Sequence, residues 1–338
     1  MSSGVFIVAE MSANHGGSIE RALETVHAIK DTGADAIKIQ TYTADTITLD
    51  CDKPDFMVGS NSIWSGQKLH DLYSQAYTPW EWHKEIFQEA NKIGLTCFSS
   101  PFDENAVDFL ESIGNPIYKI ASPEITHIPL IEYVASKGKP IIISTGIAMP
   151  VDIELAIATC RKVGNNDITL LKCTTAYPAP IEDANLRTLV DMREKYNVKV
   201  GLSDHTEGAD TAIAAAVLGA SMIEKHFIVD RTWGGPDSSF SMDKREFSNM
   251  VKSIRNVEKA LGTVCYNTNP EIIKGRRYAR SLYVAKDMKA GEIITRENVR
   301  SVRPGYGLPP KYLPQLLGKK VNRDLEMGTP MSFDYIAE

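Results

Sequence analysis

Residues 19–40 of the chain read IERALETVHAIKDTGADAIKIQ, and this stretch contains the pattern that decides the fold. Its apolar residues recur at helical spacing from Ile19 to Thr32, and Gly33 is placed to end that helix. The alternating run Ala36–Gln40 follows as a strand. A helix that closes on glycine and leads through a short loop into an apolar strand is typical of parallel β/α units. The stretch therefore predicts one such unit.

The same alternation continues on both sides of this stretch and fills residues 1–262 with eight strands. Eight units in about 260 residues match an α/β protein with a closed (β/α)8, or TIM, barrel. An open, doubly wound sheet is the alternative, but no GxGxxG motif follows a strand here. The predicted strands are Val5–Glu10, Ala36–Gln40, Thr96–Ser100, Ile117–Ser122, Pro140–Gly146, Ile168–Thr174, Lys199–His205 and Ser221–Phe227.

The rest of the chain predicts a second, smaller domain. Residues 263–280 are polar and read as a linker, and residues 281–338 read as a compact β-rich unit with Gly and Pro turns. A unit of this size is marginally stable alone, so we expect it to dock against a barrel or a partner.

Composition excludes several classes of protein. Of the 338 residues, 43% are hydrophobic, which argues against a disordered chain. The formal net charge of −6 argues against nucleic acid as a partner. The sequence contains no run of about 18 apolar residues, so we expect no membrane-spanning helix. The first residues lack the basic region of a signal peptide, and the five cysteines form no CxxC pair. We therefore expect a cytoplasmic protein with reduced thiols.

Polar residues gather at the C-terminal ends of the predicted strands, which converge on the active-site face of a barrel. The two-residue period of a strand places certain pairs on one face. Lys119 and Ser122 differ in parity, so one of them lies beyond the regular strand. The pairs that share a face are Lys38 with Gln40, Thr175 with Tyr177, Ser203 with His205, and Glu224 with His226.

These residue types predict an anion site beside a cation site. Lysine on the inward face of a barrel is costly unless an anion meets it, so Lys38 and Lys119 predict a bound phosphate or carboxylate. His205 and His226 could hold a divalent cation, although a structural role for one of them is the alternative. Glu10 could serve as an acid or a base. The hydroxyl donors of the anion site are Ser99, Ser100, Ser122, Ser144 and Ser203.

Several motifs together resemble the sialic acid synthase family. They are IVAEMSANHG at 7–16, IKIQ at 37–40, YKIAS at 118–122, ISTG at 143–146, GLSDHT at 201–206 and IEKHF at 223–227. The stretches NSIWSG at 61–66 and AYTPWEW at 76–82 look most like the pseudaminic acid synthase branch of that family.

The resemblance implies a reaction and a set of roles. Carbon 3 of phosphoenolpyruvate attacks the aldehyde of a 2-acetamido sugar, water adds at carbon 2, and phosphate leaves by C–O cleavage. In the branch, the sugar is a 2,4-diacetamido-2,4,6-trideoxy hexose and the product a nine-carbon 2-keto sugar acid. His205 and His226 would bind Mn²⁺ or Mg²⁺, which polarises the aldehyde, and Glu10 would act at the sugar end. The implied residues toward phosphoenolpyruvate are Lys38, Lys119, Ser122, Ser144, Ser203 and either Ser99 or Ser100, and those toward the sugar are Gln40, Tyr177, Asp237 and Arg303. Glu224 is a further substrate-binding residue, not assigned to either substrate.

Two further points come from the same resemblance. The unit at 281–338 resembles the antifreeze-like (SAF) domain, which implies a domain-swapped homodimer in which Arg303 reaches the sugar of the partner subunit. Thr175 stands where the family carries Asn, which puts its contact with phosphoenolpyruvate in doubt. The alternatives are a turn residue for Asp237 and a surface arginine for Arg303.

Other functions remain open from the sequence. The same chemistry could serve N-acetylneuraminate or legionaminate synthesis, because a few loop residues read the sugar. A Schiff-base aldolase would use Lys119 or Lys172 against a ketone. The third class is a binding protein with an inert barrel. That function would not explain why lysines and histidines lie at the strand ends.

Overall fold

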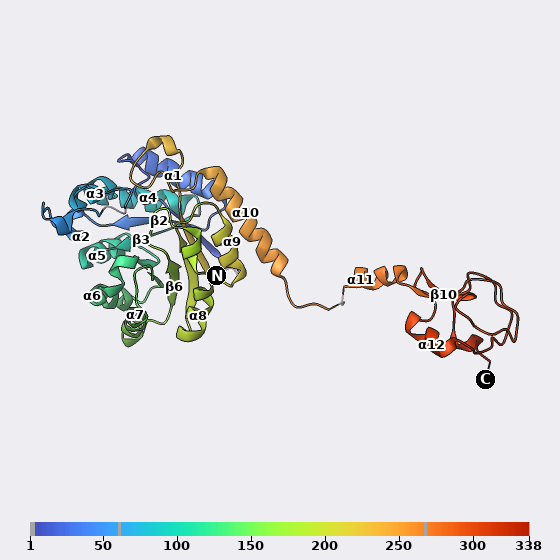
Figure 1. Cartoon of the computed structure of the whole chain (residues 1–338). Helices are drawn as coiled ribbons and strands as arrows, with labels where there is room; N and C mark the ends of the chain where they lie inside the picture. Colours follow the sequence, from blue (N-terminus) through green and yellow to red (C-terminus); the bar gives the residue numbers. More distant parts are fainter. Residues whose placement is uncertain (1–3, 60–61, 267–268, 338) are drawn as a thin grey trace. The chain divides into compact units, whose positions relative to one another are not determined.

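The computed structural model describes residues 4–59, 62–266 and 269–337, which form two compact units, Met1–Gly262 and Thr263–Glu338 (Figure 1). Asn61, the first residue of the stretch NSIWSG, lies outside the described residues.

The first unit is a closed barrel of eight parallel strands, in which neighbours in the chain pair in order and β8 pairs with β1. This arrangement confirms the predicted (β/α)8 barrel. The strands are β1 (Phe6–Glu10), β2 (Ala36–Thr41), β3 (Thr96–Pro101), β4 (Tyr118–Ile120), β5 (Ile141–Ser144), β6 (Ile168–Cys173), β7 (Lys199–Asp204) and β8 (Met222–His226).

Helices connect the strands, and their ends follow local rules. Ser18 caps the first helix by accepting a hydrogen bond from the amide of Arg21 at 3.2 Å, and Gly33 ends it in the left-handed conformation at φ 81°. The helices of this unit are α1 (Ile19–Thr32), α2 (Ala44–Ile47), α3 (Leu69–Ala76), α4 (Trp80–Lys92), α5 (Glu104–Ser112), α6 (Ile128–Ser136), α7 (Pro150–Lys162), α8 (Arg187–Tyr196), α9 (Asp210–Val217) and α10 (Lys244–Leu261).

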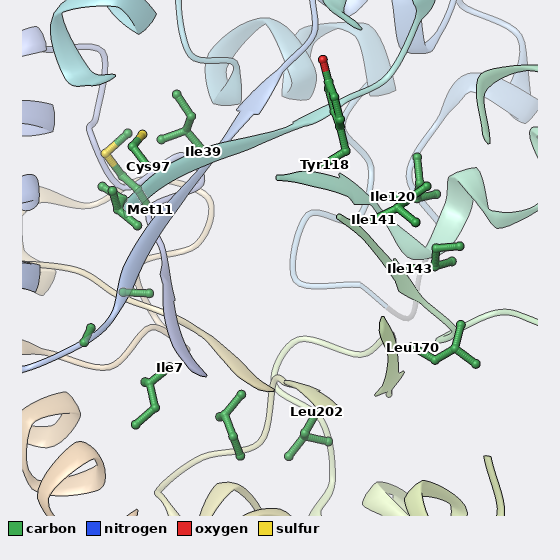
Figure 2. Close-up of a cluster of buried hydrophobic side chains, with 14 of the residues drawn as sticks. Ile7, Met11, Ile39, Cys97, Tyr118, Ile120, Ile141, Ile143, Leu170 and Leu202 are labelled. Atoms are coloured by element: carbon green, nitrogen blue, oxygen red, sulfur yellow. The ribbon is translucent and has the colours of Figure 1, made fainter. Parts of the chain in front are cut away.

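Alternate residues of each strand face opposite sides of the barrel wall. Outward-facing residues such as Ile7, Ile39 and Ile143 belong to the large buried cluster that also contains apolar side chains of the helices (Figure 2). A second cluster fills the inside of the barrel, and we call it the apolar layer. Its buried members are Val8, Ala36, Phe98, Ile142, Leu171 and Met222.

The second unit has a small core of its own, which includes Leu282, Val284 and Val299. Its strands β9 (Ser281–Val284) and β10 (Val299–Val302) form an antiparallel two-stranded sheet. Its helices are α11 (Pro270–Gly275), inside the predicted linker, and α12 (Leu313–Leu316). In the described ranges of both units, no helix combines the length and apolar character needed to cross a membrane.

Candidate active site

A layer of polar side chains lies directly above the apolar layer, at the C-terminal ends of the strands. Strand side chains repeat every two residues, so the residue two positions beyond an inward apolar residue also faces inward. On each of these strands, an apolar inward-facing residue is therefore followed, two positions later, by an inward-facing residue of the polar layer. The buried pairs are Val8 and Glu10, Ala36 and Lys38, Phe98 and Ser100, Ile142 and Ser144, Leu171 and Cys173, and Met222 and Glu224.

Four charged side chains in this polar layer form one cluster. The Lys38 ammonium lies 2.6 Å from Glu10 Oε2 and 3.3 Å from Glu224 Oε1. The Lys119 ammonium lies 3.6 Å from the same Glu224 oxygen. All four side chains are at most 6% exposed, so their charges act on one another with little screening by water. The structure thus brings two lysines and two carboxylates from four different strands together inside the barrel.

The two carboxyl groups have opposite pKa shifts. Burial raises the pKa of Glu10, and the attraction of Lys38 offsets only part of that effect. Burial also acts on Glu224, but Lys119 and Lys38 together outweigh it and lower the pKa of Glu224. Environments that push two carboxyl groups apart in this way separate a proton carrier from a permanent anion. The surroundings of Glu10 therefore favour its protonated form more than those of Glu224, whose ionised form the two lysines favour.

Hydroxyl groups beside the lysines are left free to donate. The Ser100 and Ser144 hydroxyls are buried and find no hydrogen-bond partner within the described part of the chain. Ser203 donates to Glu224 Oε1 at 3.3 Å, and the Ser122 hydroxyl accepts from the Gly146 amide at 3.0 Å. A buried polar atom without a partner is costly, so unpaired hydroxyls beside cations indicate a ligand that accepts hydrogen bonds.

Ser99 does not join this cluster. Its hydroxyl lies 2.6 Å from the Thr41 hydroxyl and donates to the Ile39 carbonyl at 3.1 Å. The cause is the register between β2 and β3, which pairs outward-facing Ile39 with Ser99 and inward-facing Gln40 with Ser100. Of the two serines that the sequence left open, Ser100 is therefore the one that faces the inside of the barrel.

Gly146 allows Thr175 to approach the cluster. A Cβ atom at Gly146 would lie 2.1 Å from the Thr175 hydroxyl, 2.8 Å from the Ser122 hydroxyl and 3.1 Å from Cys173 Sγ. The first two contacts are shorter than a Cβ atom tolerates and the third is tight, so a side chain at this position would displace the Thr175 and Ser122 hydroxyls. Thr175 thus lies beside Ser122, although its side chain is shorter than the Asn of the resembling family.

The two histidines lie together one step above the polar layer. Their ring centroids are 5.4 Å apart, and the Tyr177 ring lies 4.2 Å from His205 and 6.1 Å from His226. Nδ1 of His205 pairs with the Thr174 carbonyl at 2.9 Å, which orients the ring and leaves its other nitrogen for a ligand. Burial and the neighbouring His205 hold the pKa of His226 well below its usual value, so this ring is neutral.

This pair fits a divalent cation. Nδ1 of His226 is buried, has no hydrogen-bond partner among the described residues, and lies 3.7 Å from Asp237 Oδ2. A neutral imidazole with an unpaired buried nitrogen beside an oriented second imidazole is a suitable donor set for Mn²⁺ or Mg²⁺. No group of three or more His, Cys, Asp or Glu side chains that could hold a metal occurs in the described ranges, so the pair would leave coordination positions for other ligands.

The residues expected at the sugar end fall in two places. Gln40 donates to Glu10 Oε1 and to the Ser12 hydroxyl, both at 3.2 Å. Asp237 is buried and accepts from the Ala13 amide at 3.4 Å, so it is more than an exposed turn residue, and burial raises its pKa. Arg303 is exposed and directly follows β10 in the second unit.

Sequence reasoning missed two groups of this site, Glu124 and Cys173. Glu124 lies on a short 3-10 helix, Ser122–Thr126; its Oε2 is buried with no partner in the described ranges, and burial raises its pKa to about 7. Cys173 lies 3.9 Å from His205 Nδ1; burial acts to raise its thiol pKa, but His205, Ser122 and Lys119 together outweigh burial and lower that pKa to about 7. The signal for Cys173 was available, because it shares parity with Thr175.

The two lysines of the aldolase alternative are separated by the same parity. Lys172 lies between the inward-facing residues Leu171 and Cys173, and its ammonium donates to the Cys173 carbonyl at 2.8 Å and the Thr174 hydroxyl at 3.2 Å. Lys119 belongs to the buried cluster.

Comparisons with known proteins show the family to which the chain belongs. Residues 25–266 match the NeuB family, and residues 279–337 match the SAF domain. The chain is 48% identical to the pseudaminic acid synthase of Campylobacter jejuni strain 81-176, over 96% of this chain and 94% of that protein. It is 48% identical to the pseudaminic acid synthase of Helicobacter pylori, over 98% and 97%. A solved N-acetylneuraminic acid synthetase of Leptospira borgpetersenii is similar with a TM-score of 0.72 and 31% identity, over 81% of this chain and 92% of that one.

Proposed function

Since this chain belongs to the NeuB family and is a phosphoenolpyruvate-dependent synthase of the sialic acid type, we propose that it makes pseudaminic acid. It would condense phosphoenolpyruvate with a 2,4-diacetamido-2,4,6-trideoxy hexose and water and release phosphate. The observation that carries this proposal is the buried pair Lys38 and Lys119 with unpaired hydroxyls beside it, one step below two histidines.

The anion site would hold phosphoenolpyruvate. Lys38 and Lys119 supply charge, and Ser100, Ser144 and Ser122 supply directed hydrogen bonds to phosphate or carboxylate oxygens. Charge-assisted hydrogen bonds in a buried site are stronger than neutral ones, so the two ammonium groups would favour an anion over a neutral sugar, with Glu10 and Glu224 offsetting part of their charge. The sugar would then occupy the level above, near the histidines and Tyr177.

His205 and His226 would hold the divalent metal, which supplies Lewis-acid polarisation of the aldehyde when bound. The protein's own contribution to proton transfer would come from carboxyl groups. Glu10, fixed by Gln40 and Lys38, can carry a proton toward the sugar end, and Glu124 can exchange a proton near neutral pH because burial raises its pKa to about 7.

We also propose that the second unit contributes to the site of another subunit. Arg303 is exposed and has a guanidinium group suited to a polar sugar substituent. In a domain-swapped homodimer, residues 281–338 of one chain would cover the barrel mouth of its partner. Truncation of the chain after Leu261 should then abolish turnover, and full activity of the truncated protein would contradict this part of the proposal.

The test is a phosphate-release assay with 2-acetamido and 2,4-diacetamido hexoses, with and without Mn²⁺. Highest kcat/KM with a 2,4-diacetamido-2,4,6-trideoxy hexose is the expected result, and preference for N-acetylmannosamine would point to N-acetylneuraminate synthesis. Borohydride with pyruvate should leave the enzyme active, because inactivation would indicate a Schiff-base aldolase.

A pair of lysine variants tests the anion site directly. Lys119→Ala should raise the KM for phosphoenolpyruvate by about tenfold or more, because it removes a charged hydrogen-bond donor. Lys172→Ala, on the next strand but one and outside the polar layer, is the matched control and should leave that KM as in the wild type. Equal values for both variants would show that the anion site is misplaced.

A further inference from the structure

A pocket of about 370 Å³ lies beside the barrel mouth and has a different chemistry from the polar layer. It forms between the connection from β2 to α4 and the segment that follows β8. Every residue that lines it is uncharged. We call it the neutral pocket, and its lining includes Trp64, Gln67, Leu72, Gln75, Pro236 and Ser239.

Two aromatic rings lie between the neutral pocket and the histidine pair. The Trp64 indole N–H donates to the Pro236 carbonyl at 3.0 Å and so joins the two segments that form the pocket. The centroid of the same indole lies 5.7 Å from the Tyr177 ring, whose centroid lies 4.2 Å from that of His205. One aromatic ring after another therefore leads from the histidine pair to the pocket.

The backbone makes the same connection. Pro236 and Ser238 line the neutral pocket, and Asp237 between them is buried with its carboxylate 3.7 Å from His226 Nδ1. The segment that forms this part of the pocket wall therefore also reaches the histidine pair, through Asp237.

The lining chemistry defines what the pocket accepts. Trp64, Leu72 and Pro236 offer apolar surface, and the side-chain amides of Gln67 and Gln75 make no hydrogen bond within the described ranges of the chain. The described residues that line the pocket include no cation for a phosphate or a carboxylate. A neutral group with both a methyl and an amide matches this lining, because the methyl covers apolar surface and the amide pairs with glutamine.

We propose that the neutral pocket receives a second acetamido group of the sugar, the one farther from the reacting aldehyde. This inference rests on the proposed function, and it assigns the choice between a 2,4-diacetamido sugar and its 4-hydroxy counterpart to this pocket. A hydroxyl group at that position would leave the apolar wall and both amides facing water, so the difference between the two sugars is read here.

The experiment compares kcat/KM for two sugars, a 2,4-diacetamido-2,4,6-trideoxy hexose and the same sugar with a hydroxyl group at carbon 4. Ser239→Phe places a ring into the pocket from an exposed position. Its ratio of the two kcat/KM values should fall by about tenfold or more, because the acetamido group loses its space. Gln75→Leu, which removes one amide without adding bulk, should lower the same ratio in the same direction.

Ser136→Phe, at an exposed serine at the end of α6, is the matched control and should keep the wild-type ratio. An unchanged ratio in both pocket variants, or equal losses with both sugars, would overturn the assignment of the pocket. No phosphate release by the wild-type chain with either sugar would instead refute the proposed function. The two failures are therefore distinguishable.

Discussion

Replacing Lys225 with methionine tests how the C-terminal ends of β7 and β8 are held together. Lys225 pairs in register with Asp204 on the outward side of the wall, and its ammonium lies 2.8 Å from Asp204 Oδ2. The side chains are 2% and 1% exposed, so this ion pair is fully buried. Each partner directly precedes or follows a site residue, because Asp204 precedes His205 and Lys225 lies between Glu224 and His226.

The expected loss follows from what remains after the substitution. Lys225→Met keeps a long apolar side chain but leaves the Asp204 carboxylate buried without its cation. The carboxylate keeps hydrogen bonds from the Thr206 amide at 3.0 Å and from the Thr206 and Thr211 hydroxyls at 2.8 and 2.7 Å. Because these bonds still solvate it, we expect the low end of the usual range for a broken buried pair, about 3 kcal/mol of unfolding free energy.

The assay is denaturant unfolding of the full chain, read as a change in midpoint at constant slope. The control is Lys244→Met, which removes an exposed pair: Lys244 lies 2.7 Å from Asp31, with side chains 48% and 63% exposed. Screening by water should limit its loss to about 1 kcal/mol or less. Similar small losses for the two variants would refute the reasoning that burial makes the Lys225–Asp204 pair indispensable.

Three other predictions concern the site. His226→Ala should weaken Mn²⁺ binding, measured by calorimetry on metal-free protein, by about a hundredfold or more, and unchanged affinity would remove this residue from the cation site. Gly146→Ala should lower kcat/KM for phosphoenolpyruvate by about tenfold to a hundredfold, because its Cβ would lie 2.1 Å from the Thr175 hydroxyl; Gly59→Ala, with no atom within 4 Å, is the control that should match the wild type. Burial raises the pKa of Glu124 from 4.5 to about 7, so the native state favours its protonated form and loses that stabilisation as the pH rises between these values. Relative to wild type, Glu124→Gln should therefore gain up to about 3 kcal/mol of unfolding free energy from pH 4.5 to pH 7, and parallel pH profiles would contradict this assignment.

Much of the barrel could be predicted because the local sequence of each repeat is enough to indicate its helix and its strand. In the repeat at 19–40, the capped helix, its terminal glycine and the alternation of Ile37, Lys38, Ile39 and Gln40 were all sufficient to place Lys38 inside and Ile39 outside. The two-residue period does not depend on knowing which strand lies next to which.

Other features depend on contacts between strands, which no single repeat contains. Ser99 and Ser100 are equivalent in their local sequence, and only the register with β2 decides which of them faces inward. The importance of Glu124 is equally hidden, because its raised pKa comes from burial after the short helix folds back beside the barrel. Trp64 is a third case, since its partner Pro236 is distant in the sequence.

The apolar layer has a consequence for the order in which molecules can enter the barrel. Val8, Phe98 and Ile142 are at most 2% exposed, so the floor beneath the lysines is sealed. In the described part of the barrel, a molecule that binds above this apolar layer therefore enters from the C-terminal ends of the strands. Two ligands that enter from the same side must bind in order, so the deeper ligand binds first and dissociates last.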